Sequence, residues 1–158
     1  MSRSFDVVVI GAGPAGYIAA IRAAQHGMTV ACIDEWKNRD GKYAFGGTCL
    51  NAGCIPSKAL LESSELYHRA QHEFKKHGIQ TGDVAMDIAT MQKRRASIVR
   101  QLTGGIAGLF KANKVEGLVG HGKLLAGRKG EFTPVSGDGE TLDARPGVVA
   151  SGASPREL

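Results

Sequence analysis

The stretch FDVVVIGAGPAG, residues 5–16, places a short β-branched run directly before a glycine-rich turn. The run is typical of a buried parallel strand. The turn is an instance of G-x-G-x-x-G, and residues 15–26 have helical composition up to Gly27, a residue type that commonly ends a helix. A second apolar run, residues 29–33, leads to Asp34. This order of strand, glycine turn, helix and strand predicts a βαβ unit and an α/β fold.

Each glycine of the turn has a separate task in such a unit. Gly11 makes the turn, Gly13 lets the backbone approach a pyrophosphate, and Gly16 lets the helix pack on the strand. The helix N-terminus adds N–H groups and a positive dipole end. Asp34, 23 positions after Gly11, can accept a hydrogen bond from a ribose 2′-hydroxyl and would repel a 2′-phosphate. The pattern therefore predicts FAD or NAD as ligand, with a glycine-rich turn that binds nothing as the alternative.

A second chemical element is GGTCLNAGCIPSK, residues 46–58, which carries Cys49 and Cys54 five positions apart. In an ideal helix their Cα atoms would be roughly 8–9 Å apart, whereas a disulfide requires about 7 Å or less. A bond between them therefore needs a backbone bent away from ideal helix, for which Asn51 and Gly53 supply freedom. A short, strained disulfide tends to be redox-active. Two buried thiols that never meet are the alternative.

Length, composition and charge limit the class of protein. The chain has 158 residues, 42% hydrophobic and 22% charged, which predicts one domain with a substantial core. Its net charge of +5 comes from scattered basic residues without interleaved aromatics, so we expect solvated helix faces and no nucleic-acid partner. Asp6 and Arg22 interrupt the N-terminal apolar region, which argues against a signal peptide or membrane span. Three cysteines do not form a secreted disulfide framework, and we predict a cytoplasmic protein.

Helices and short strands follow the cysteine segment. An apolar stripe on residues 60–74 predicts a helix ending at Gly78, and a second stripe on residues 91–110 predicts a helix behind the N-cap Asp87. We interpret both stripes as faces that pack into the core. The final third alternates β-like runs with glycines, and we predict a small antiparallel meander from residues 115–119, 123–125, 131–134 and 148–150.

The histidines suggest no further chemistry. Cys49, Cys54, His68 and His72 satisfy the loose spacing of a zinc finger. However, the residues between them are helical and needed for packing, and no β-hairpin precedes them, so we predict no metal site. The other histidines, His121 included, have no acidic or serine partner at a recognisable spacing, and no hydrolytic triad is expected.

Together, the glycine turn and the segment GGTCLNAGCIPSKALL, residues 46–61, resemble the pyridine nucleotide-disulfide oxidoreductases. Within that family the segment is most similar to that of the dihydrolipoyl dehydrogenases. The resemblance extends over essentially the whole chain, including residues 121–123 and 149–153. It implies a Rossmann-like FAD-binding domain with a βαβ unit, a redox helix, a long helix and an inserted β-meander. Glutathione and mercuric reductases are similar here and stay open as alternatives.

The resemblance also implies roles for individual residues. Cys49 matches the outer thiol that exchanges with the substrate, Cys54 the flavin-side thiol, and Lys58 the lysine near the flavin ring, where a cation would lower the pKa of a thiol. Asp34, or Glu35 with a shift of one residue, matches the group that holds the adenosine ribose. The remaining cofactor contacts would be Gly11, Gly13, Pro14 and Gly16 at the pyrophosphate, Gly47 and Thr48 along the cofactor, Gly122 beside the adenine, and Ser151 and Gly152 near the domain exit.

The implied reaction is oxidation of dihydrolipoamide to lipoamide, with electrons passing through Cys49, Cys54 and FAD to NAD. The implied partners are the lipoyl domain of a 2-oxo acid dehydrogenase complex and, in the full-length enzyme, a second copy of the chain. The sequence has no second G-x-G-x-x-G for a nicotinamide cofactor. We therefore expect residues 1–158 to be the amino-terminal part of an FAD-binding domain, truncated before the NAD-binding and dimerisation domains and inactive alone. A non-catalytic module with an FAD-binding fold is the alternative.

Overall fold

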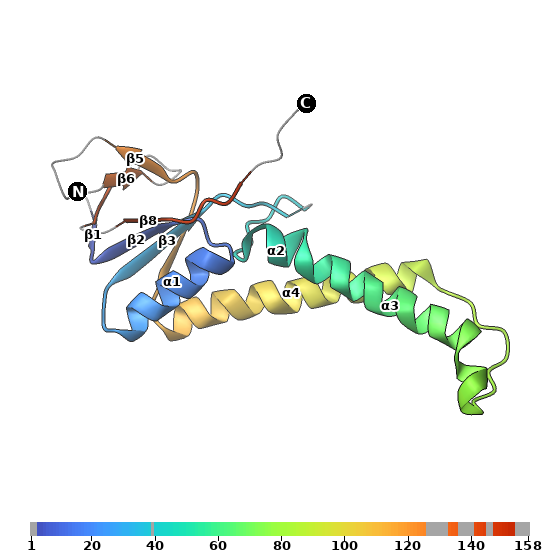
Figure 1. Ribbon diagram of the computed structural model, residues 1–158. Coiled ribbons are helices and arrows are strands. Elements are labelled where there is room, and N and C mark those ends of the chain that lie inside the picture. The colour runs from blue at the N-terminus through green and yellow to red at the C-terminus, as the bar shows by residue number, and fades with distance from the viewer. Residues whose placement is uncertain (1–2, 39, 126–132, 136–140, 145–146, 154–158) are drawn as a thin grey trace.

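The computed structural model describes residues 3–38, 40–125, 133–135, 141–144 and 147–153. At its centre is a parallel sheet of β2 (Val7–Ile10), β3 (Val30–Asp34), β4 (Glu116–Val119) and β8 (Gly147–Val149), in the order β4-β3-β2-β8 (Figure 1). Numbered by their appearance in the chain, these strands run 3-2-1-4, the order of a Rossmann-type sheet. The predicted α/β fold with a βαβ start is therefore confirmed.

The inner strands are buried on both faces, which explains their continuous apolar sequence. Val7 and Val9 pack with side chains of α1 (Pro14–Gln25) and α4 (Ile88–Ala112) on one face of the sheet. Val8 packs on the opposite face under β7 (Leu142–Ala144), which pairs in parallel with β1 (Arg3–Phe5). Because successive side chains of a strand point to opposite faces, one short run supplies both cores.

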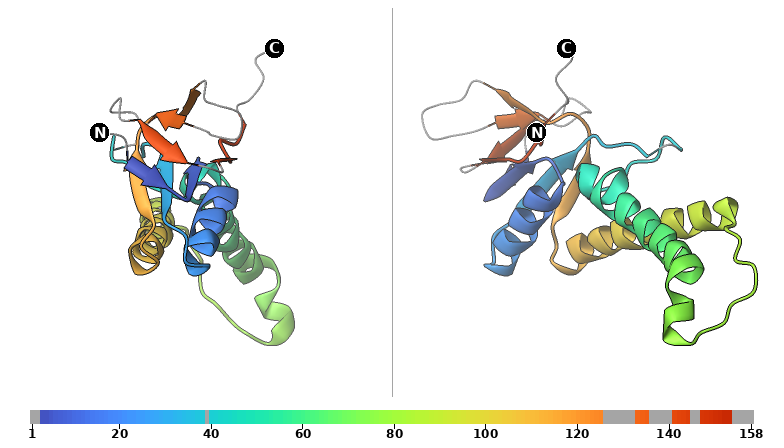
Figure 2. Two further views of the ribbon diagram at one scale, coloured as in Figure 1. Left: turned by 90° about the vertical axis from the view of Figure 1, so that its left-hand side faces the viewer. Right: turned by 45° about the vertical axis from the view of Figure 1, so that its right-hand side comes forward.

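Between β3 and β4 the chain forms a long helical hairpin that projects beyond the sheet (Figures 1 and 2). It consists of α2 (Gly47–Asn51), α3 (Cys54–His72), the 3₁₀ turn η1 (Phe74–His77) and α4. Arg94 of α4 joins the two long helices, since it donates to the carbonyl oxygen of Ala59 at 2.9 Å and to the carboxylate of Glu62 at 2.6 Å. This contact ties α4 to the N-terminal half of α3.

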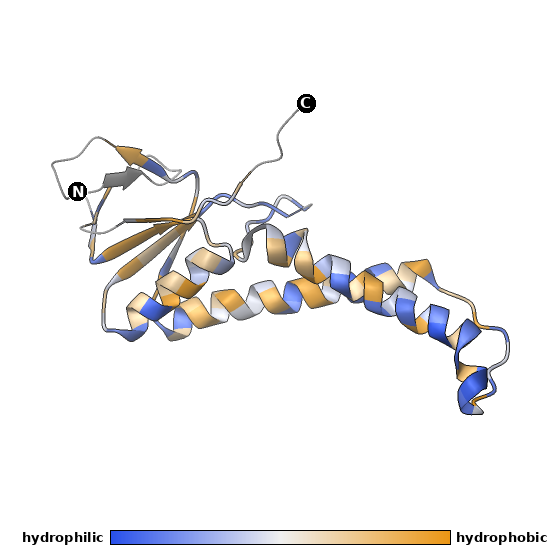
Figure 3. Cartoon of the chain, viewed as in Figure 1, coloured by the Kyte–Doolittle hydropathy of each residue, from blue (hydrophilic) through white to orange (hydrophobic). Residues whose placement is uncertain are grey.

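The prediction that both helix stripes pack into the core is wrong for the outer part of the hairpin. Ile106 and Phe110, near the sheet, are buried, whereas Leu61 and Leu66 are 63% and 55% exposed. The hairpin projects beyond the sheet, so no third layer of the described residues covers these side chains. Figure 3 accordingly shows apolar strands but alternating apolar and polar residues along the hairpin. Periodicity identifies an apolar helix face without showing what covers it.

The predicted antiparallel meander is correct only for its middle. β5 (Lys123–Leu125) and β6 (Thr133–Val135) form an antiparallel pair, but β4 and β8 lie in the central parallel sheet. Residues 131–132 of the third predicted strand lie outside the described residues. A run of three to five apolar residues shows that a strand forms but not which strand it pairs with, because pairing depends on distant parts of the chain.

Candidate functional site

The carboxyl ends of β2 and β8 meet at the position where the strand order of the sheet reverses. Gly11 follows β2 and Ala150 follows β8, and the Ala150 N–H donates to the carbonyl oxygen of Ile10 at 2.8 Å. Gly11 has φ +96°, and a Cβ there would lie 2.3 Å from the carbonyl oxygen of Ala150. Glycine is therefore required both by conformation and by space. In open α/β sheets, ligands bind in the crevice formed at this reversal point.

The first turn of α1 faces this crevice without a capping side chain. Gly13 is its N-cap, Pro14 is the first helical residue, and no acidic residue occurs in the first turn. The N–H groups of that turn therefore remain available to an anion. A Cβ on Gly16 would lie 1.7 Å from the carbonyl oxygen of Gly11, which confirms the predicted packing role of Gly16. Because Gly16 has no Cβ, α1 can begin directly against the turn.

Backbone contacts dock the cysteine segment on the same glycine turn. The Gly46 N–H donates to the carbonyl oxygen of Ala12 at 2.8 Å. Gly47 has φ +59°, and a Cβ there would lie 2.6 Å from the Cα atom of Gly13. Side chains would separate the two segments, so the glycines on both sides allow the close approach. The start of α2, and Cys49 with it, is thereby fixed beside the start of α1.

The backbone between the two cysteines departs from an ideal helix. Residues five positions apart could not form a disulfide without such a departure. The N–H groups of Ala52 and Gly53 both donate to the carbonyl oxygen of Thr48, at 2.9 and 2.7 Å, and α2 ends there. A new helix, α3, then begins at Cys54. The two helices meet at a bend, and the cysteines lie on either side of it as free thiols.

The Cys54 side chain and the Lys58 ammonium group act on Cys49 in opposite directions. The pKa of Cys49 is raised above its ordinary value, first by its hydrogen bond with the Cys54 side chain and then by burial and the charge of Cys54. The Cys54 backbone N–H and the Lys58 ammonium group oppose this by lowering the pKa. The Cys54 side chain therefore stabilises the protonated form of Cys49, whereas the Lys58 ammonium group stabilises its thiolate.

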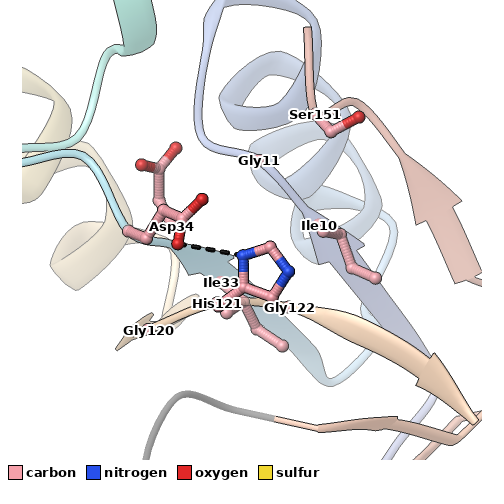
Figure 4. Close-up of a pocket in the computed structure, with 9 residues that line it drawn as sticks. Ile10, Gly11, Ile33, Asp34, Gly120, His121, Gly122 and Ser151 are labelled. Atoms are coloured by element: carbon pink, nitrogen blue, oxygen red, sulfur yellow. Dashed lines mark hydrogen bonds and ion pairs between the residues drawn. The ribbon is translucent and has the colours of Figure 1, made fainter.

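One open cleft connects these elements. Its volume is about 700 Å³, within the usual range of roughly 300–1,000 Å³ for cofactor sites. Most of the predicted site residues line it, namely Gly11, Gly13, Pro14, Asp34, Gly47, Thr48, Cys49, Cys54, Ser151 and Gly152. Gly16 is buried behind the turn, and Lys58 is exposed on α3. Gly122 lines an adjacent cavity of about 100 Å³, which shares Gly11, Asp34, Glu35 and Ser151 with the cleft (Figure 4).

Asp34 is oriented by backbone groups of its surroundings. One carboxylate oxygen accepts from the Ala12 N–H at 2.5 Å and the other from the Trp36 N–H at 2.7 Å. Because each oxygen has a second lone pair, the carboxylate can still accept from a ligand. Glu35, the alternative by a shift of one residue, instead contacts His121.

Sequence reasoning missed several residues at this site. Trp36 and Ala150 line the cleft, and His121 and Gly120 line the adjacent cavity. No spacing in the sequence indicated an acidic partner for His121, but in the fold its Nδ1 lies 2.9 Å from a carboxylate oxygen of Glu35, 86 positions away. Ala150, Gly120 and His121 follow the carboxyl ends of β8 and β4. Assigning those strands to the parallel sheet would have identified them.

Two further features concern the described residues alone. They contain no group of three or more histidine, cysteine, aspartate or glutamate side chains placed to hold a metal ion. None of their helices combines the length and apolar character that a bilayer-spanning helix requires.

This chain belongs to the pyridine nucleotide-disulphide oxidoreductase family, whose model matches residues 5–158. It is 50% identical over 160 residues to the dihydrolipoyl dehydrogenase of Cupriavidus necator, covering 100% of this chain and 34% of the relative. It is 43% identical over 153 residues to the mitochondrial dihydrolipoyl dehydrogenase 2 of Arabidopsis thaliana, covering 97% and 29%. A leghemoglobin reductase of Vigna unguiculata is also 43% identical, with 97% and 28% covered. The chain thus spans about a third of the length of these relatives.

Proposed function

We propose that the chain carries the redox half-site of an FAD-dependent dithiol–disulfide oxidoreductase that oxidises dihydrolipoamide to lipoamide. The observation that carries this proposal is the single cleft that contains both the glycine turn and the cysteine pair. A glycine-rich βαβ turn alone would support only dinucleotide binding, and two nearby thiols alone would support only redox chemistry. Their presence in one cleft supports electron transfer between a dithiol and a bound flavin.

The residues present fit FAD. The turn around Gly13 leaves its Cα open to the cleft, with nothing nearer to an added Cβ than the Gly47 Cα at 3.9 Å. A pyrophosphate placed there would accept from the unpaired N–H groups at the start of α1. Asp34 is held where it can accept from a ribose hydroxyl. The cysteines line the other part of the cleft, where the isoalloxazine ring would have to lie.

The chain's own part in the reaction is thiol–disulfide exchange. In the oxidised form, one thiolate of dihydrolipoamide attacks the Cys49 sulfur of a Cys49–Cys54 disulfide, and Cys54 leaves as a thiolate. The second substrate thiolate then attacks the substrate sulfur of the mixed disulfide, which releases lipoamide and leaves Cys49 reduced. Two electrons thus move from the substrate to the cysteine pair, and the two thiol protons of dihydrolipoamide pass to the cysteine thiolates or to solvent. Bound FAD supplies the acceptor that returns the pair to the disulfide, with NAD as final acceptor.

Lys58 and the Cys54 backbone N–H would serve this exchange by stabilising the Cys49 thiolate, since both oppose the rise in the pKa of Cys49 that the Cys54 side chain causes. The protein that contains this chain would act as a homodimer on the lipoyl domain of a 2-oxo acid dehydrogenase complex in the cytoplasm. The identities of 41–50% to dihydrolipoyl dehydrogenases support this substrate over glutathione or mercuric ion.

The visible absorption spectrum of the chain loaded with FAD, before and after anaerobic dithiothreitol, tests the proposal. We expect a flavin spectrum that gains a long-wavelength band when the Cys54 thiolate forms beside the ring. Cys54→Ser should abolish the band, whereas Cys49→Ser should keep it, since only the flavin-side sulfur produces it. Dihydrolipoamide should generate the band faster than glutathione does.

The other results separate the alternatives. A yellow protein without the band would contradict the roles of the cysteines and favour a plain FAD-binding module. A chain that is colourless once unbound FAD has been removed would contradict cofactor binding by these residues.

A further inference from the structure

The C-terminal end of α3 lies near the tip of the helical hairpin, beyond the sheet (Figure 1). His68 and His72 occupy this end four positions apart, and residues at that interval lie on the same face of a helix. Their imidazole rings have centroids 4.5 Å apart, with an angle of 48° between the ring planes. Both residues are exposed. The backbone of α3 therefore brings two imidazoles together at a surface that a dissolved ion can reach.

This pair of rings has the chemistry of a metal chelate. Neutral imidazole is a common protein ligand of Zn²⁺, Cu²⁺ and Ni²⁺. Two histidines four positions apart on one helix face are also the arrangement by which a helix supplies two ligands to zinc in metalloproteases. Once one ring has bound an ion, the helix holds the second ring at a high effective concentration beside it. The two rings together should therefore bind an ion much more tightly than either ring alone.

The charges near the pair select the kind of ion. His72 is the last residue of α3, where the negative end of the helix dipole favours a cation. Arg69 lies between the two histidines in the sequence, but its Nε is 3.2 Å from a carboxylate oxygen of Glu73, which offsets its charge. Lys75 and Lys76 of η1 follow and repel cations. This balance favours an ion held by metal–nitrogen bonds over one held by charge alone.

The two histidines must bind such an ion without the cysteines. Cys54 begins α3 and His72 ends it 18 positions later, which is roughly 27 Å along the axis of an ideal helix. A zinc finger that includes the cysteines is therefore impossible, and the expectation of no metal site concerned that set of four residues. Within the part of the chain that the structure describes, no histidine, cysteine or carboxylate joins the pair to make a group of three ligands. Water would fill the remaining positions around the ion.

We propose that His68 and His72 form a two-histidine chelate for a divalent cation from the end of the first transition series. Cu²⁺ should bind most tightly, and Ni²⁺ and Zn²⁺ less tightly, in the order that these ions follow at nitrogen ligands. The ion links successive turns at the end of α3, beyond the contact of Arg94 with Glu62, and so restrains that end of the helix. The site lies outside the redox cleft and does not depend on the proposed redox function.

Isothermal titration with CuCl₂ tests the site. The parent chain for this experiment carries Cys49→Ser and Cys54→Ser, so that no thiol of the cleft binds or reduces the ion. His68→Ala and His72→Ala should each weaken Cu²⁺ binding by about 100-fold, the lower end of the roughly 10²–10⁴-fold gain from linking two binding groups. Electron paramagnetic resonance of the bound Cu²⁺ should show two nitrogen ligands in the parent chain and one in either variant.

A variant with the same number of histidines is the matched control. His68→Ala combined with Gln71→His places two histidines at adjacent positions, and adjacent residues of a helix do not face each other. It should bind Cu²⁺ as weakly as His68→Ala does. His77→Ala removes an exposed histidine of η1 and should leave the affinity unchanged. Added Zn²⁺ should slow amide hydrogen exchange at the end of α3 in the parent chain but not in the variant with adjacent histidines.

The possible results separate this site from other modes of metal binding. Unchanged Cu²⁺ affinity in His68→Ala and His72→Ala would overturn the inference, because the ion would then bind elsewhere. Parental affinity in the variant with adjacent histidines would do the same, since the shared helix face would be unnecessary. Loss of binding in His77→Ala would assign the ion to a different set of side chains and would also contradict the inference. The flavin spectrum that tests the redox proposal is independent of all these results.

Discussion

Replacing Gly16 by alanine is expected to destabilise the chain by about 2 kcal/mol. The added Cβ would lie 1.7 Å from the Gly11 carbonyl oxygen and 2.8 Å from its carbon, whereas real Cβ atoms essentially never approach closer than 3.0 Å. The start of α1 must therefore move at least 1.3 Å (3.0 minus 1.7) away from the turn. Overpacking of this kind costs about 1–3 kcal/mol. We take the upper end because the obstacle is backbone, and subtract up to about 1 kcal/mol for the better helix propensity of alanine.

The assay is urea denaturation followed by far-ultraviolet circular dichroism, with thermal unfolding alongside it. A loss of about 2 kcal/mol corresponds to a fall of roughly 4–8 °C in Tm for a chain of this size. Gly104→Ala is the matched control, since Gly104 lies within α4 and an added Cβ would meet nothing within 4 Å. It should stabilise the chain by about 0.5–1 kcal/mol. FAD affinity should also fall in the Gly16 variant alone, because the N–H groups of α1 are displaced.

A Gly16→Ala chain as stable as the wild type would refute this reasoning. It would mean that the turn can relax without loss, and that the closeness of α1 to Gly11 does not depend on glycine. Equal destabilisation by Gly104→Ala would point instead to a general effect of the substitution.

Three further predictions concern titratable groups. Burial raises the pKa of Cys32 from 9.0 to about 12, with a smaller contribution from Asp34. The stability that the protonated thiol contributes is complete below pH 9 and is lost as the pH rises toward 12. The free energy of unfolding should therefore fall by about 2 kcal/mol between pH 8 and 10.5. Urea titrations should show this loss, and Cys32→Ala should lack it. Cys54→Ala should lower the pKa of Cys49, because the largest cause of its elevation is the Cys54 side chain; the pH dependence of iodoacetamide alkylation measures it, and an upward shift would contradict the assignment. Asp87 caps α4 by accepting a hydrogen bond from Thr90, which lowers the pKa of Asp87. The stability that this carboxylate contributes is present above its unfolded pKa and is lost as the pH falls through its folded pKa. In Asp87→Asn, the free energy of unfolding should therefore fall less steeply with decreasing pH than in the wild type.

The cysteine segment illustrates how far local sequence reasoning extends. The five-residue interval between Cys49 and Cys54 is incompatible with a bonded pair in ideal helix, and the structure has a bend there between α2 and α3. The glycines on either side were recognised as well. The sequence does not show why glycine is needed at Gly47, because the close contact of Gly47 with Gly13 joins segments 34 positions apart. No local pattern reports such a contact.

The strands of the final third show where local reasoning ends. Each was recognisable as a short apolar run, but β4 and β8 were placed in the wrong sheet. Which edge of β2 or β3 a later strand pairs with depends on where the connecting segments lead the chain, and therefore on residues far away in the sequence. The same error hid His121 and Ala150, since their positions follow from the carboxyl ends of those strands.

By itself, the sequence determined the βαβ unit, its glycine turn, the acid after the second strand and the paired cysteines, because each depends on residues close together in the chain. Tertiary structure alone decided that these elements share one cleft, that Glu35 meets His121, and that Leu61 and Leu66 are left exposed. The physical reason is that backbone conformation and periodicity are local properties. Sheet order, cavity shape and contacts between distant side chains arise only when separate elements pack against one another.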